Sequence, residues 1–152
     1  MKDIQPFIPL VALAAGVILG VAVGKFWLAA PETVTTHTVE FVLKKSAADG
    51  KPKIYAQPEK VDAQPGDIVL FRNLAEQEVK VDFTAVGSVE SPFAGLSAFT
   101  LGPASDLESF ARADVVKESA AVKDYQYTVD PNGATEQSPV IRIGPKKTVS
   151  DS

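Results

Sequence analysis

Few side chains in this sequence could carry chemistry, and several of them fall in one loop. The stretch "YQYTVDPNGATEQSPV", residues 125–140, alternates apolar and polar residues and then passes through Asp130, Asn132 and Glu136. Loops of this form between two strands often hold a metal ion or a nucleophile. Here the loop supplies only carboxylate and amide oxygens, and their spacing differs from that of a calcium-binding loop. Capping of a turn is the better interpretation of these three residues.

The counts of cysteine and histidine exclude most metal and nucleophile chemistry. Cysteine is absent, which removes disulfides, thiolate zinc sites and iron–sulfur clusters. Because His37 is the single histidine, this chain alone cannot build a two-imidazole site, and a Ser-His-Asp arrangement has little support. We interpret His37 as a surface or hydrogen-bonding residue, and Glu76 and Glu78 as a solvated strand edge. We therefore expect no enzyme activity, no metal and no other cofactor.

Charge and composition limit the class of partner. The 152 residues carry a formal net charge of -4, so no basic stripe is available to neutralise nucleic-acid phosphates. A hydrophobic content of 45% is enough for a packed core. This length allows one modest domain plus an anchor or a tail.

Strand patterns follow one another over residues 31–146. Residues 31–46 begin with a β-branched, alternating run, and residues 54–86 predict two further strands joined by the turn Gln64-Pro65-Gly66-Asp67. Residues 125–129 and 140–143 have the same character. About six to eight short strands favour an all-β sandwich or barrel.

Two segments interrupt or end this pattern. In "SDLESFARADVV", Ser105 as an N-cap and Glu108 at the third helical position predict one short helix. Residues 147–152 read as a solvated, flexible tail.

The first thirty residues predict a membrane anchor. Residues 7–24 contain no charge and would span about 27 Å as a helix, and the following "KFWLAA" extends the segment across a hydrocarbon core of about 30 Å. Trp27 suits the aromatic belt, and Lys25 can extend to the interface. A cleaved signal peptide ending near Lys25 is the alternative, although its apolar region would be longer than usual.

One face of this predicted helix carries small residues at every fourth position: Ala12, Gly16, Gly20 and Gly24. Such a face lets a second helix approach closely in lipid, so we expect transmembrane helices of another protein as partners. The alternative is that glycine and alanine are simply common in membrane spans. The short N-terminal tail favours a single-pass protein of the inner (cytoplasmic) membrane, with the β-domain on the extracytoplasmic or periplasmic side.

A family resemblance appears in two stretches of the β-domain. "PEKVDAQPGDIVLFRNLAEQEVKVDF" resembles the cupredoxin pattern of a strand, a Gly-Asp turn and a strand ending in Phe-x-Asn, and Val79 stands where copper-binding members place a first histidine. In the second stretch, Val129 occupies the position of the cysteine ligand and Asn132 that of the second histidine ligand. Gln137 lies near the position of the methionine ligand. The resemblance covers roughly residues 34–144 and implies a Greek-key β-sandwich. A blue-copper site needs two imidazoles and a thiolate, so the resemblance implies that this site is absent.

The resemblance, with its ligands missing, also implies a non-catalytic function. We expect a non-catalytic, copper-free accessory or structural subunit of a larger membrane complex, of respiratory or photosynthetic type. The alternative is a membrane-anchored binding module for a small ligand or a soluble partner. Because redox partners dock at the loop end of cupredoxin barrels, the expected contact residues are Leu74, Val79, Pro131, Asn132, Ala134 and Gln137.

Overall fold

A computed structural model describes residues 33–84, 90–130 and 137–146. The chain divides into two compact units, Met1–Thr33 and Val34–Ser152, and all of the described secondary structure belongs to the second. Within the described ranges, no helix is long and apolar enough to cross a membrane. The predicted anchor, with its small-residue face, lies outside these ranges.

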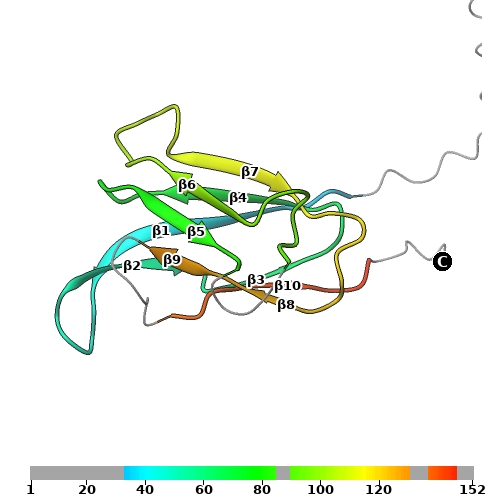
Figure 1. Ribbon diagram of the computed structural model, residues 1–152, viewed down its shortest axis with the longest axis horizontal. Coiled ribbons are helices and arrows are strands. Elements are labelled where there is room, and N and C mark those ends of the chain that lie inside the picture. Colours follow the sequence, from blue (N-terminus) through cyan, green and yellow to red (C-terminus); the bar gives the residue numbers. More distant parts are fainter. Residues whose placement is uncertain (1–32, 85–89, 131–136, 147–152) are drawn as a thin grey trace, which may run out of the picture. The chain divides into compact units, whose positions relative to one another are not determined.

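The β-domain consists of short strands in three sheets (Figure 1). Sheet A has the order β2-β1-β4-β7, sheet B has β3-β10-β8, and sheet C has β6-β5-β9. The strands are β1 Thr36–Lys45, β2 Pro52–Gln57, β3 Lys60–Ala63, β4 Ile68–Asn73, β5 Val79–Asp82, β6 Ala98–Leu101, β7 Ala111–Val115, β8 Asp124–Gln126, β9 Thr128–Asp130 and β10 Val140–Ile143. The expected all-β fold is therefore confirmed for the described residues, which form ten strands where six to eight were expected.

Alternation along the strands places one face of each sheet in a shared core. In β4, Val69 and Phe71 are fully buried, and Leu70 between them is only half-buried. Phe71 stacks on Phe41 of β1 and meets Tyr127 edge-on at 6.3 Å between ring centroids. Such aromatic pairs stabilise a core beyond the area they bury. The contact with Tyr127, which lies between β8 and β9, joins sheet A to the other two sheets.

The parallel and antiparallel strands of sheet A define two opposite ends of the domain. The register Thr36↔Ile68↔Val115 places the start of β1, the start of β4 and the end of β7 together, and we call this the N-terminal end. The opposite end, which we call the loop end, carries the β1–β2, β4–β5 and β6–β7 connections (Figure 1). The ten residues of β1 separate these ends by roughly 30 Å at about 3.3 Å per residue.

Three local predictions are wrong. The range 54–86 takes in four strands, β2 to β5, where two were expected. No helix forms after Ser105, because a turn stabilised by the carboxylate of Asp106 comes first and Ala111–Val115 then pairs with β4. The predicted strand over residues 125–129 is divided at Tyr127, whose N–H donates to Pro139 O at 3.1 Å. As a result, β8 belongs to sheet B and β9 to sheet C.

Candidate functional site at the loop end

Valine side chains fill the two described positions at which the family resemblance implies a histidine and a cysteine ligand. Val79 is completely buried and Val129 is 3% exposed. Val129 pairs with Val81 on the neighbouring strand, and Val79 lies two residues before Val81 on the same face of β5. The two ligand positions are therefore close together, but they form part of the apolar core and offer no lone pair to a metal.

Asn73, the last residue of the Phe-x-Asn motif, organises the loops above these valines. It is fully buried, and its side-chain amide donates to Gln77 O and to Gly102 O at 2.7 Å each. Its Oδ1 accepts from Ala75 N at 2.9 Å. The Asn73 side chain thus holds the two sides of the β4–β5 loop together and links this loop to the β6–β7 loop.

Gln137, at the methionine place, points into the domain. Its Oε1 accepts from Ala56 N at 3.0 Å, across 81 residues of sequence. Because β2 is an edge strand of sheet A, this contact satisfies a backbone donor that β1 does not reach. Gln137 therefore helps to join β2 to the segment before β10.

The predicted contact residues differ in how much of each side chain is exposed. Leu74 is 41% exposed, whereas Val79 lies in the core and has no surface to offer a partner. Pro131, Asn132 and Ala134 lie outside the described residues.

A second exposed leucine, missed from the sequence, lies on the loop that contacts the loop of Leu74. Leu107, in the β6–β7 loop, is 81% exposed. Ala104 N donates to Ala75 O at 2.8 Å, so the loops that carry the two leucines are in contact. The signal in the sequence was a leucine between acidic residues in "SDLES", which was interpreted as a helix start.

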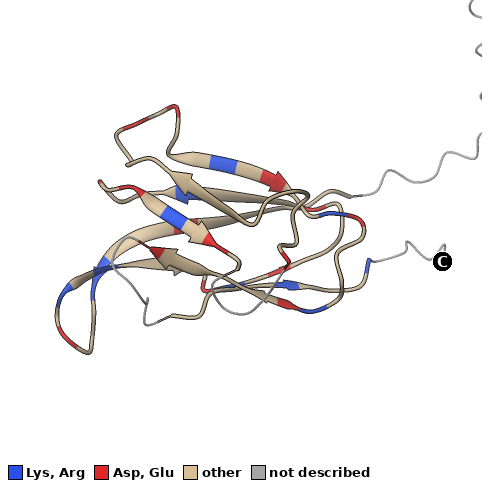
Figure 2. Ribbon diagram, in the orientation of Figure 1, with Lys and Arg blue, Asp and Glu red and all other residues tan. Residues whose placement is uncertain are grey.

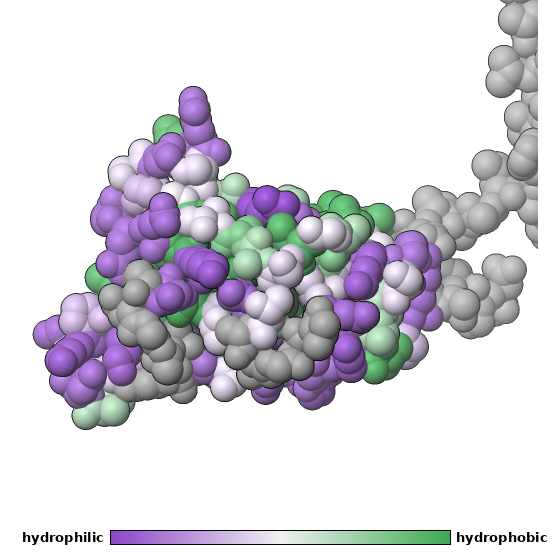
Figure 3. Space-filling model, viewed as in Figure 1, coloured by the Kyte–Doolittle hydropathy of each residue, from purple (hydrophilic) through white to green (hydrophobic). Residues whose placement is uncertain are grey.

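Carboxylates are the neighbours in sequence of both leucines. Four exposed acidic residues lie on the two loops: Glu76, Glu78, Asp106 and Glu108. Figure 2 shows red segments on both loops, and Figure 3 shows the projecting β6–β7 loop as mainly hydrophilic with a small hydrophobic area. Hydrogen bonds from the Ser109 hydroxyl and the Glu108 N–H lower the pKa of Asp106, so this carboxyl stays charged at neutral pH. The surface is apolar at two points and negative around them.

Nothing within residues 33–84, 90–130 and 137–146 groups three His, Cys, Asp or Glu side chains in a way that could hold a metal ion. The described residues at the loop end therefore do not fit a copper ion.

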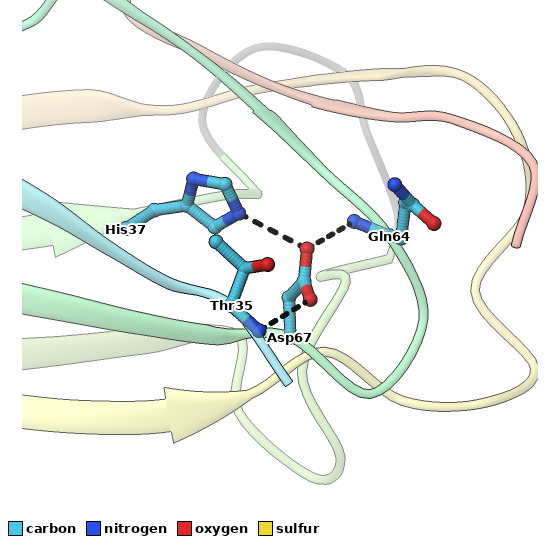
Figure 4. A network of polar contacts seen from close by, with 4 residues as sticks. All are labelled: Thr35, His37, Gln64 and Asp67. Atoms are coloured by element: carbon cyan, nitrogen blue, oxygen red, sulfur yellow. Dashed lines mark hydrogen bonds and ion pairs between the residues drawn. The ribbon is translucent and has the colours of Figure 1, made fainter. Parts of the chain in front are cut away.

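A polar cluster at the N-terminal end includes the lone histidine. Asp67, 6% exposed, accepts hydrogen bonds from His37 Nε2 at 3.0 Å, Thr35 N at 3.0 Å and Gln64 N at 2.9 Å (Figure 4). The interpretation of His37 as a hydrogen-bonding residue is confirmed. The predicted turn is confirmed as well, since Asp67 N donates to Gln64 O and Gly66 adopts a φ of 89° that favours glycine.

The ionisation of Asp67 reflects opposing effects. Burial is the largest single effect and by itself raises the pKa of this carboxyl. Hydrogen bonds from His37, Thr35 and Gln64 together outweigh burial, so the pKa of Asp67 lies below its ordinary value. The carboxylate is therefore a stable acceptor that ties the start of β1 to the turn before β4.

The chain was compared with families, with curated proteins and with solved structures. No family model matches the chain, and no curated protein matches it. Among solved structures, it is similar to a Cu(I) form of an amicyanin mutant, with 15% identity and a TM-score of 0.42 over 76% of this chain and 89% of that one. It is also similar to Fet3p, a multicopper oxidase that functions in iron import, with 15% identity and a TM-score of 0.46 over 75% of this chain and 24% of that one. Likenesses this distant carry no argument about ligand, activity or partner.

Proposed function

We propose that this protein is a copper-free, non-catalytic accessory subunit of a larger membrane complex, of respiratory or photosynthetic type. The observation that carries the proposal is the burial of Val79 and Val129 in the core, at positions where the cupredoxin resemblance implies metal ligands. The strands and the hydrogen bonds of Asn73 give the loop end a defined surface. The two valines at the implied ligand positions cannot bind a metal ion, so this surface remains available for protein contact only.

Two contacts would hold the subunit in its complex. The predicted anchor supplies Ala12, Gly16, Gly20 and Gly24 to a neighbouring transmembrane helix. The β-domain, on the extracytoplasmic side, supplies the loop end with Leu74 and Leu107. Charged side chains are depleted at the centre of protein interfaces, so the leucines suit the centre and the surrounding carboxylates suit the rim.

Co-purification in mild detergent tests this function. The full chain, tagged at its C-terminus and extracted from its own membranes, should elute with a constant set of membrane proteins, and its intact mass should include residues 1–24. Elution of the chain alone, or with one soluble protein, would favour the alternative of an anchored binding module. A mature chain that starts near Lys25 would overturn the anchor.

A charge placed in the loop end tests the second contact. Leu74→Lys with Leu107→Lys should release the β-domain from its partner. Leu107 is 81% exposed but Leu74 only 41%, so thermal unfolding of the double variant must first show that the domain remains folded. The matched control is Gln126→Lys, at an exposed position of β8 on sheet B. Normal assembly of the double variant would exclude the loop end as the docking surface.

A further inference from the structure

The N-terminal end of the β-domain exposes aliphatic side chains. Val34 is 58% exposed, Val115 is 57% exposed, and Val122, in the connection from β7 to β8, is 65% exposed. Val115 pairs with Ile68, whose N–H donates to Thr35 O at 2.9 Å, so Val34 and Val115 lie at the same corner of sheet A. Figure 3 shows hydrophobic surface near this end of the domain.

The outer face of sheet A is uncharged where it reaches this end. Val69 and Phe71 point into the core, so their neighbours Ile68 and Leu70 point outward. The two cross-strand rows nearest the N-terminal end are Thr36, Ile68 and Val115, followed by Thr38, Leu70 and Ala113. The first charged row is Glu40 with Arg72, and these two neutralise each other at 3.2 Å. The outward face of a sheet that meets water is ordinarily polar, so this corner is unusual.

Lysine side chains lie on the connections around this corner. Lys123 is exposed and Lys117 is half-buried, and both lie in the connection from β7 to β8, which also carries Glu118. The Nζ of Lys123 lies 4.8 Å from the centroid of the Tyr125 ring. Figure 2 shows both blue and red segments on this connection. A third lysine, Lys146, pairs with Glu118 at 3.1 Å. Exposed aliphatic groups with lysines beside them match the chemistry of a bilayer interface, where hydrocarbon meets anionic phosphate.

The short connection between the predicted anchor and Val34 also favours a lipid bilayer as the binding partner of this end. The anchor is expected to end by Ala30, and residues 31–33 precede Val34. At about 3.6 Å per residue at most, these three residues allow roughly 11 Å of separation. If the anchor ends at Ala30, Val34 therefore lies within about this distance of its last residue.

We propose that the N-terminal end of the β-domain is a lipid-contacting surface: Val34, Val115 and Val122 enter the interface of an anionic bilayer, while Lys117 and Lys123 bind lipid phosphate. This inference rests on the membrane anchor of the proposed function, but it needs no partner protein. It also gives the two ends separate roles, because the loop end would then be presented to partners roughly 30 Å from the lipid.

Single-cysteine labelling of the full chain tests the proposal, since the natural sequence contains no cysteine. Val34→Cys, Val115→Cys and Val122→Cys would each carry an environment-sensitive fluorophore, in lipid nanodiscs that contain phosphatidylglycerol. Leu107→Cys at the loop end is the matched control, because it is also an exposed aliphatic position. Thermal unfolding of each labelled variant confirms that it is folded before quenching is measured.

The expected result is shielding at the N-terminal end alone. Labels at positions 34, 115 and 122 should be several-fold less accessible to aqueous iodide than the label at 107, and brominated lipid should quench them. Adding Lys117→Glu and Lys123→Glu should reduce the shielding in anionic nanodiscs. Equal iodide quenching at all four positions would overturn the proposal, as would failure of the chain to enter nanodiscs. Shielding that occurs only in the purified native complex would also overturn it, because a protein would then cover this surface. None of these outcomes depends on whether the subunit co-purifies with a complex.

Discussion

Nε2 of His37 lies 3.0 Å from Oδ2 of Asp67, across 30 residues of sequence. This contact joins the strand through which the chain enters the β-domain to the turn that starts β4. The carboxylate also accepts two backbone N–H groups, so it satisfies three donors at a nearly buried position. It is a structural junction at the N-terminal end of the domain.

Asp67→Asn should destabilise the β-domain at neutral pH. Hydrogen bonds to a charged group contribute more than neutral ones, and we expect a loss of about 1–3 kcal/mol in the free energy of unfolding. Because the pKa of Asp67 is lowered in the folded state, the stabilisation is complete above about pH 4 and disappears as the pH falls through the folded-state pKa. Denaturant unfolding of both proteins at pH 7 and at pH 3 should therefore show a difference that shrinks in acid.

Asp62→Asn is the control for this measurement. The Asp62 side chain is 73% exposed and lies 3.8 Å from Lys60, so its loss should change stability little at either pH. A difference between wild type and Asp67→Asn that stays constant from pH 7 to pH 3 would contradict the assigned role of the carboxylate.

Asn73→Ala should loosen the loop end. The substitution leaves Ala75 N, Gln77 O and Gly102 O without their side-chain partner, and we expect a cost of at least about 2 kcal/mol in the free energy of unfolding. Amide hydrogen exchange should accelerate in the β4–β5 and β6–β7 loops. Gln77→Ala is the matched control, because Gln77 takes part through its backbone carbonyl; an equal loss in both variants would argue against the amide network.

Gln137→Leu should weaken the attachment of edge strand β2. Ala56 N would lose its acceptor, at an expected cost of about 1–2 kcal/mol, whereas Gln137→Glu keeps an oxygen in place and should restore most of the stability. Thermal unfolding of the three proteins measures this difference. If leucine is tolerated as well as glutamate, the Ala56 contact does not stabilise the domain.

The sequence predicts those parts of the fold that depend on local pattern. Alternation in β1 and the glycine at position 66 of the turn before β4 indicate their structures directly. The segment after Ser105 misleads, because its capping pattern suits a helix while pairing of Ala111–Val115 with β4 determines the outcome. Tertiary pairing overrides local propensity there.

The polar contacts between residues far apart in the sequence could not be predicted in the same way. His37 and Asp67 are 30 residues apart, and Ala56 and Gln137 are 81 apart, so neither pairing leaves a periodic signal. The resemblance located Val79 and Val129 through their motifs, but which side chains become core and which stay exposed depends on the folded domain. For that reason Val79 was expected on a contact surface and Leu107 was not.

Gly20→Leu should weaken association of the predicted anchor with its partner helix. Leucine adds volume to the small-residue face, where two backbones would approach closely. The fraction of chain that co-purifies with the complex should fall, whereas Val17→Leu, off this face, should leave it unchanged. Equal retention of both variants would contradict packing through Ala12, Gly16, Gly20 and Gly24.

Copper titration of the purified full chain tests the central claim most directly. Titration with Cu(II), followed by removal of weakly bound metal and measurement of copper per chain, should find no stoichiometric ion and no strong visible charge-transfer band. The reason is that Val79 and Val129 place hydrocarbon at two of the implied ligand positions, and His37 is the chain's only imidazole. One tightly held copper ion per chain would contradict the account of a copper-free subunit.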